Sequence, residues 1–211
     1  MAASDSEAVE VVRVYRAAAR SFADLVRMIP VDRYPGPGLG EWDLRALVGH
    51  TARSLVTVIT YLDQPATTVD ITSAEEYYQV AATVAAAEGA GVVERGRRAG
   101  AELGDDPAAA VDALVSEASA KLDGRGDELI AVLGGAGMHL FTYLPTRIFE
   151  LAVHSLDIAD ATGLPYTAPE EVMSGATTLG ARVATVMGHG EVLLRALTGR
   201  GALPDPFSVT A

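Results

Sequence analysis

The segment from residue 146 to residue 159 restricts the fold more than any other part of the chain. Four of its polar residues lie three or four positions apart: Arg147, Glu150, His154 and Asp157. In an α-helix these side chains lie within an arc of roughly 80°, over about three turns. The residues between them are mainly apolar, which indicates a largely buried helix. Because buried polar groups are costly unless they are paired or bound to something, we expect this stripe to face a site.

Within this stripe, Glu150 and His154 are candidate metal ligands, because residues four apart on a helix point the same way. The same spacing also occurs by chance, and the alternative is a buried salt-linked pair. His50 favours the metal site, since it flanks the apolar seam of another expected helix that can face this one. Two histidines and one carboxylate leave coordination positions open, as is typical of catalytic rather than structural sites.

Zinc is the first candidate for this metal, although iron, nickel and manganese accept the same donors. We expect Arg147 and Asp157 to lie just outside the ligands, where they would orient them or hold an anionic group of a substrate. The alternative for both residues is an ordinary salt bridge between helices.

The composition limits the chemistry and the partners. The chain has no cysteine, so any thiol must be supplied by a small molecule. Lys and Arg number 16 against 28 Asp and Glu, and the net charge of −12 argues against nucleic acid and anionic membranes as partners. No secretory signal is visible, and glycines and Pro145 make the uncharged run 129–146 a poor membrane span. We therefore expect a cytoplasmic protein.

Apolar residues spaced three and four apart predict an all-α chain. No internal repeat and no long β-alternation is visible. Its 211 residues, 49% of them hydrophobic, suit a single metal-binding domain over 1–211, with a helical-bundle core at about 7–163 and additional C-terminal helices and a tail at about 167–211. We expect helices at about 7–29, 43–62, 73–99, 107–122, 142–161, 167–187 and 191–197.

Local signals set several of these boundaries. Asp43 and Asp106 are expected to cap the second and fourth helices, and Thr167 with Glu170 to cap the sixth. Gly163 is expected to end the fifth helix, and the glycine-rich connection before that helix to form a buried loop.

Other aromatic and histidine side chains have structural explanations. We expect Trp42 to pack the loop before the second helix, His139 to be buried and structural, and His189 to be an exposed cap at a helix break. A pocket role for His139 is the alternative. Tyr77, Tyr78 and Tyr143 either line a pocket or belong to the core with their hydroxyls at the surface.

Residues Gly40 to His50 read Gly-x-Trp-Asp-Leu-Arg-x-Leu-x-x-His, and Arg147 to Asp157 read Arg-x-x-Glu-x-x-x-His-x-x-Asp. These segments resemble the DinB-like helical-bundle superfamily, and they are most similar to its mycothiol-dependent maleylpyruvate isomerase branch. The segments 193–200 and 203–209 also resemble that branch. Residues 64–140 match none of its motifs.

The resemblance implies a DinB-like four-helix bundle with additional C-terminal helices, in which His50, Glu150 and His154 bind a divalent metal. It also implies a low-molecular-weight thiol such as mycothiol as cosubstrate, for isomerisation or S-transfer. A metal with an open position can lower the pKa of a bound thiol or polarise a carbonyl. Because superfamily members also form dimers, a homodimer is one arrangement to test.

We therefore expect an enzyme, a metal- and mycothiol-dependent transferase or isomerase that acts on a small electrophilic substrate. One alternative is a non-catalytic helical protein that binds a small molecule in its bundle. Another is a metal hydrolase or lyase that needs no thiol. The residues do not choose between isomerisation and S-transfer, and they do not name the substrate.

Overall fold

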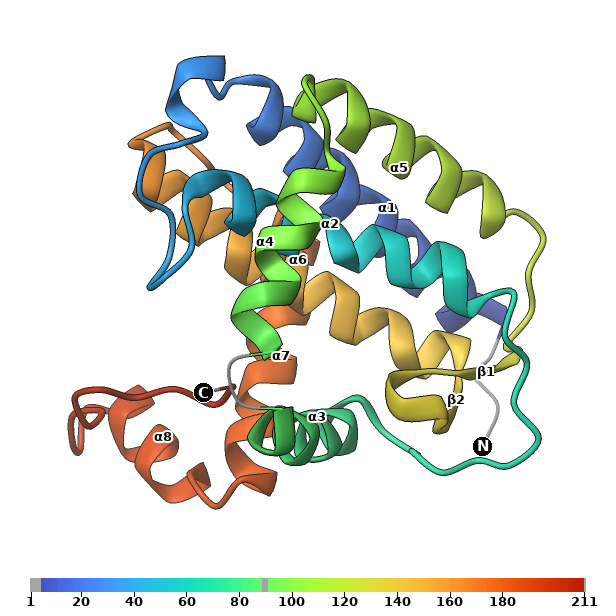
Figure 1. Ribbon diagram of the computed structural model, residues 1–211. Coiled ribbons are helices and arrows are strands. Elements are labelled where there is room, and N and C mark those ends of the chain that lie inside the picture. Colours follow the sequence, from blue (N-terminus) through green and yellow to red (C-terminus); the bar gives the residue numbers. More distant parts are fainter. Residues whose placement is uncertain (1–4, 89–90, 211) are drawn as a thin grey trace.

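The computed structural model describes residues 5–88 and 91–210. This part of the chain is mostly helical, which confirms the expected fold class (Figure 1). No helix within it is both long and apolar enough to cross a membrane. The elements are α1 (Asp5–Arg27), α2 (Leu44–Tyr61), α3 (Ala74–Glu88), α4 (Gly91–Glu102), α5 (Pro107–Lys121), β1 (Leu129–Ala131), β2 (Gly137–His139), α6 (Leu140–Thr162), α7 (Glu170–Val186) and α8 (Gly190–Leu197), with 3₁₀ turns at Val31–Arg33 and Leu133–Gly135.

Helices α1, α2, α5 and α6 form the core of the bundle. Both α1 and α2 pack against α5 and against α6, so the arrangement closes on itself (Figure 1). Full burial of a large apolar side chain stabilises a fold by roughly 1.5–3 kcal/mol, so the inward faces of these helices hold the bundle together. The fully buried side chains on these faces include Tyr15, Phe22, Leu25, Leu44, Leu47, Leu55, Leu140, Tyr143 and Leu144.

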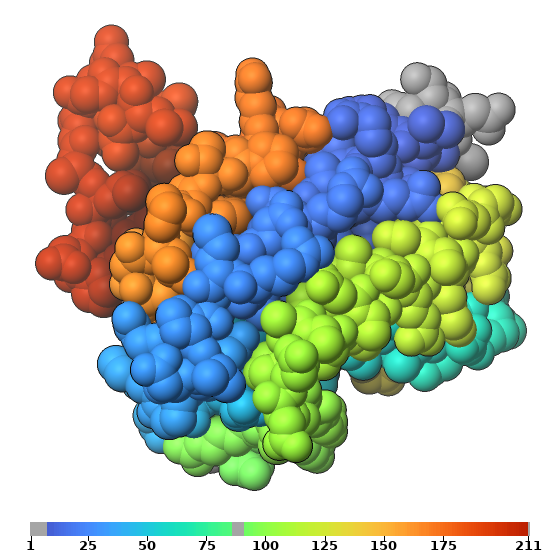
Figure 2. Space-filling model, turned by 90° about the horizontal axis from the view of Figure 1, so that it is seen from above, coloured from blue at the N-terminus to red at the C-terminus, as the bar shows by residue number. Residues whose placement is uncertain are grey.

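The remaining helices cover this core from outside. Helix α4 packs across α2, and α7 packs on α6 and contacts α3 and α1. Helix α8 packs on α7, and Figure 2 shows the C-terminal segment at the edge of the molecule beside it. Leu194 and Leu197 on α8 are 63% and 72% exposed, so this helix adds little to the core.

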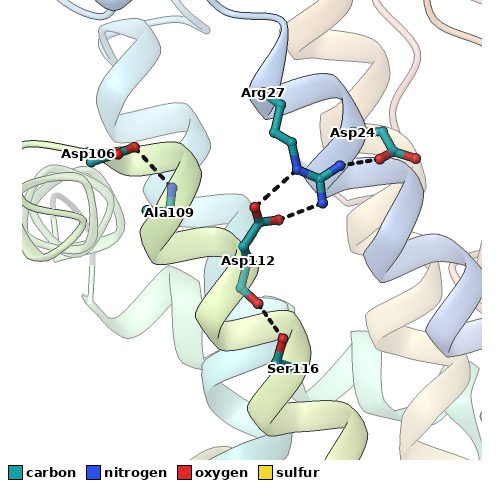
Figure 3. A network of polar contacts seen from close by, with 6 residues as sticks. All are labelled: Asp24, Arg27, Asp106, Ala109, Asp112 and Ser116. Atoms are coloured by element: carbon teal, nitrogen blue, oxygen red, sulfur yellow. Dashed lines mark hydrogen bonds and ion pairs between the residues drawn. The ribbon is translucent and has the colours of Figure 1, made fainter.

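An ion pair joins α1 to α5 on the outside of the bundle (Figure 3). Arg27 donates from Nε and Nη2 to the two carboxylate oxygens of Asp112, at 3.0 and 2.7 Å, and it also contacts Asp24. Asp106 caps α5 as predicted, accepting from the backbone N–H of Ala109 at 3.0 Å. Because half-exposed ion pairs contribute at most about 1 kcal/mol, the apolar contact supplies most of the stability between these helices.

The single helix predicted over 73–99 is wrong. The chain forms α3 up to Glu88 and a separate α4 from Gly91. Residues 89 and 90, between these two helices, lie outside the described part of the chain. The two helices also contact different neighbours: α3 packs on α7 and α6, whereas α4 packs on α2.

Two further boundaries differ from expectation. The glycine-rich connection forms an antiparallel hairpin rather than a loop, with Ile130 opposite Met138, both buried. Gly134 and Gly135 turn the hairpin with φ of 67° and 88°, values that favour glycine. Thr167 caps nothing, because α7 begins at Glu170 with Pro169 at the N-cap position and without a side-chain cap.

Candidate metal centre

The structure brings His50 of α2 together with Glu150 and His154 of α6. One potential ligand atom from each residue lies within 4.8 Å of the other two. The imidazole rings of His50 and His154 are nearly perpendicular, with centroids 4.9 Å apart, and Nε2 of His154 lies 3.3 Å from Oε2 of Glu150. The three residues proposed from the sequence therefore lie together in the structure. Metal binding by these residues remains a prediction.

Local structure at the start of α2 positions His50. Asp43 caps the helix as predicted, accepting a backbone hydrogen bond at 2.7 Å. The ring of Trp42 then lies 4.4 Å from that of His50, and its Nε1 donates to the carbonyl of Val93 on α4 at 3.0 Å. Gly96 makes room for this indole, since a Cβ there would lie 2.5 Å from it. Trp42 thus holds His50 as well as packing the helix start.

Asp157 orients His154. Its Oδ2 lies 2.9 Å from Nδ1 of His154, which leaves Nε2 directed at Glu150. Burial opposes a charge on His154, but the hydrogen bonds to Asp157 and Glu150 outweigh it and raise the pKa to about 9. A carboxylate on the far nitrogen is the usual arrangement behind a metal-bound histidine. The metal-free chain therefore carries His154 as an imidazolium at neutral pH.

Tyr78 of α3 also holds Glu150 in place through a hydrogen bond. The phenol donates to Oε1 of Glu150 at 2.8 Å and to the backbone carbonyl of Thr146 at 3.2 Å. Burial would raise the pKa of Glu150, but the hydrogen bond from His154 and the charge of Arg147 lower it to about 2. Of the two alternatives for Tyr78, a core position with the hydroxyl at the surface is therefore wrong, because the hydroxyl is inside and reaches a candidate ligand.

His50 is neutral in this environment. Burial, together with repulsion from His154, lowers its pKa to about 4. Its Nδ1 is buried without a hydrogen-bond partner in the described part of the chain. Since buried polar atoms are normally satisfied, an unpaired nitrogen on a ring that lies beside a carboxylate and a second imidazole suits a residue that binds a cation. The three residues therefore suit a divalent cation with open positions.

Arg147 lies on the same face of α6, one turn before Glu150. Its guanidinium carbon is 5.2 Å from the ring centroid of Tyr77 and 4.9 Å from that of Tyr143. Burial penalises this charge, but Tyr143, Tyr77 and Glu150 keep its pKa above the ordinary value. Among the described residues no carboxylate lies within ion-pair distance of it, so the alternative of an inter-helix salt bridge does not hold for Arg147.

The other histidines lie outside this cluster. His139 is not buried as expected, because its side chain is 41% exposed where β2 meets α6, and its Nδ1 is 3.1 Å from the carbonyl oxygen of Asp127. His189 is exposed at the start of α8 as expected, but its side chain makes no cap hydrogen bond. Its ring packs instead near Phe207, with centroids 5.7 Å apart.

Metal binding near neutral pH is expected to release about one proton per ion. His154, with its pKa of about 9, must lose the Nε2 proton, whereas His50 and Glu150 are already deprotonated. The apparent affinity should therefore rise about tenfold per pH unit and level off above about pH 9. Calorimetry in buffers of different ionisation enthalpy measures the proton count. Asp157→Asn should lower it, and a count of zero for the unaltered chain would contradict the imidazolium assignment.

Tyr78→Phe is expected to weaken metal binding by about 10- to 100-fold with the fold retained. The change removes only the hydroxyl that donates to Glu150, and partners behind metal ligands typically contribute this much. Competition against a chromophoric chelator measures the affinity. Tyr166→Phe makes the same chemical change where the hydroxyl contacts Ser21, away from the cluster, and should leave the affinity unchanged. Equal affinities for the two variants would show that Tyr78 does not support the site.

A DinB-like helical bundle with a His–Glu–His cluster between two core helices defines the class of this protein. The family profile described as the mycothiol maleylpyruvate isomerase N-terminal domain matches residues 15–159, which is more than half of the chain. The chain belongs to this family. The matched region contains all three cluster residues and leaves α7 and α8 outside. No curated protein and no solved structure matches the chain.

Proposed function

We propose that the protein is a divalent-metal-dependent enzyme that uses a low-molecular-weight thiol, mycothiol first of all, to act on a small electrophile. The convergence of His50, Glu150 and His154 carries this proposal. The family supports the thiol, since its description names mycothiol. Zinc is the first candidate for the ion, because two imidazoles and a carboxylate with a vacant position are common in catalytic zinc sites.

A divalent ion in this site would supply a Lewis acid, which lowers the pKa of a thiol or polarises a carbonyl group. The chain supplies the positioning: Asp157 orients His154, and Tyr78 orients Glu150. Trp42 packs against His50. Ligands supported in this way hold their geometry when substrate enters. The absence of cysteine requires the nucleophilic sulfur to come from the cosubstrate.

Two reaction outcomes share one first step, the addition of the thiolate to the electrophile. If addition to a conjugated double bond is followed by rotation and elimination of the thiolate, the product is the isomer and the thiol is recovered. If the carbon–sulfur bond persists, the outcome is S-transfer and the thiol is consumed. Product analysis therefore decides between isomerase and transferase.

The proposal is tested by elemental analysis of the purified protein, followed by a screen of electrophiles with mycothiol. We expect about one metal ion per chain, and adduct formation or isomerisation that requires both metal and thiol. Metal-loaded protein that produces neither outcome across the panel would contradict the proposal. Turnover in thiol-free buffer would favour a hydrolase or lyase, and a copurifying small molecule without turnover would favour a binding protein. Sedimentation of the same sample tests the proposed homodimer.

A further inference from the structure

A cavity separate from the His–Glu–His cluster lies where α3, α6 and α7 meet. These three helices pack on one another (Figure 1), and the open cavity between them measures about 400 Å³. Pro145 of α6 lines it, and this residue points about 200° around the helix from Arg147, two positions later. The cavity therefore opens on another face of α6 and shares no residue with the candidate metal centre.

Gly175 of α7 leaves part of this cavity open. It lies inside the helix, where glycine is less favourable than alanine by roughly 0.5–1 kcal/mol. Its backbone does not require glycine, since φ is not positive, and a Cβ added there would meet nothing within 4 Å. Gly49 is different, because a Cβ on it would collide with the backbone of α4. Packing thus requires glycine at position 49 but not at position 175, where its effect is to widen the cavity.

Two opposite charges line the cavity without partners, Glu75 on α3 and Arg182 on α7. Within residues 5–88 and 91–210, neither side chain has a hydrogen bond or an ion pair, with the other or with any third residue. The cavity therefore offers a carboxylate and a guanidinium that do not satisfy each other.

The hydroxyl of Thr178, on the same face of α7, is also free in the described part of the chain. Threonines inside helices often donate to the carbonyl four residues earlier. Thr83 of α3 and Thr185 of α7 do so, at 3.0 and 2.9 Å. Thr178 makes no such bond, so its hydroxyl is available to a molecule in the cavity.

We propose that this cavity binds a small aliphatic α-amino acid in its zwitterionic form. The planar guanidinium of Arg182 matches the carboxylate of the ligand, and Glu75 matches its ammonium group. The rest of the lining includes apolar groups that suit an aliphatic side chain, as small-molecule sites usually do: Ala74, Pro145 and Leu179. A simple anion or amine would match only one of the two charges, and a neutral polyol would match neither. The inference is independent of the proposed function.

The test is an NMR titration of the ¹⁵N-labelled protein with L-valine, L-valinamide and N-acetyl-L-valine. Valinamide lacks the carboxylate and N-acetylvaline lacks the ammonium group. We expect valine to bind about three- to tenfold more tightly than either analogue, because each loses one charged contact at a partly exposed site. Valine should shift the amide signals of residues 72–75 and 175–182, which line the cavity or lie beside its lining.

Three variants assign these contacts. Arg182→Gln should remove the advantage of valine over valinamide, and Glu75→Gln its advantage over N-acetylvaline. Gly175→Leu fills the open space and should abolish binding. Arg20→Gln and Glu170→Gln are the matched controls, because they neutralise exposed charges outside the cavity and should leave the valine affinity unchanged.

Equal binding of valine and its two analogues would overturn the inference, and so would valine shifts confined to other parts of the chain. The absence of shifts with alanine, valine and leucine alike would also overturn it. Glucose, titrated as a neutral polyol, should not bind; tighter binding of glucose than of valine at these amides would contradict the zwitterion. If Gly175→Leu does not fold, as judged by circular dichroism, the analogue comparison on the unaltered chain still decides.

Discussion

Replacing His154 with alanine is expected to abolish stoichiometric metal binding, with the affinity falling by more than about 100-fold. The change removes one of three candidate ligands and leaves Asp157 with nothing to orient. Loss of an orienting partner alone typically weakens metal binding 10- to 100-fold, so loss of the ligand itself must exceed that. Elemental analysis after dialysis measures the metal content, and thiol-dependent turnover should disappear with it.

His189→Ala is the matched control for this experiment. It is the same substitution at an exposed histidine beside α8, outside the cluster, and it should leave one ion bound. If His154→Ala also keeps a full equivalent of metal at the affinity of the unaltered chain, the ion binds elsewhere and the proposed function loses its site. Circular dichroism of both variants shows whether a lost ion reflects lost structure.

The part of the site that lies on α6 could be predicted because it is local. A helix places residues three and four apart on one face, so the spacing alone brings Glu150 and Asp157 to His154. His50 is different, since it lies on another helix and no spacing relates it to α6. The resemblance of its surrounding segment to the family, together with its place beside an apolar seam, supplied that link.

The residues that hold the candidate ligands in place depend on the path of residues 64–140, which the family profile covers but in which the sequence analysis recognised no motif. Tyr78 reaches Glu150 only because α3 packs on α6, and Trp42 meets Val93 only because a separate helix, α4, packs on α2. Periodicity predicts that a segment is helical, but it does not say which helix lies beside it. These tertiary contacts had no signal in the sequence.

Periodicity also did not predict how far neighbouring elements cover an apolar face. Leu156 belongs to the apolar part of α6, yet it is 41% exposed. His139 stands among apolar residues and was expected to be buried, but the two-stranded hairpin leaves its side chain at the surface. For Leu156 the residue types indicate the helix correctly but not its exposure, whereas for His139 neither the strand nor the exposure of its side chain was expected.

Replacing Gly49 with alanine is expected to destabilise the fold by about 3 kcal/mol or more. Helices α2 and α4 cross so closely at Gly49 and Gly100 that a Cβ on Gly49 would lie 2.2 Å from the backbone nitrogen of Gly100. Overpacking typically destabilises by 1–3 kcal/mol, and here the obstacle is backbone, which cannot move unless the helices separate. Urea denaturation followed by circular dichroism measures the free energy of unfolding.

Gly175→Ala is the same chemical change, but it is expected to have the opposite effect on stability. Gly175 lies inside α7, and a Cβ there meets nothing within 4 Å, so alanine should stabilise the helix by about 0.5–1 kcal/mol. If the free energy of unfolding falls in Gly49→Ala and rises in Gly175→Ala, then the close helix crossing, and not helix propensity, requires glycine at position 49. Because α4 carries the Val93 carbonyl that holds Trp42 against His50, Gly49→Ala should also weaken metal binding. If Gly49→Ala stabilises the chain as Gly175→Ala does, the two helices are not in close contact and this support of His50 is lost with them.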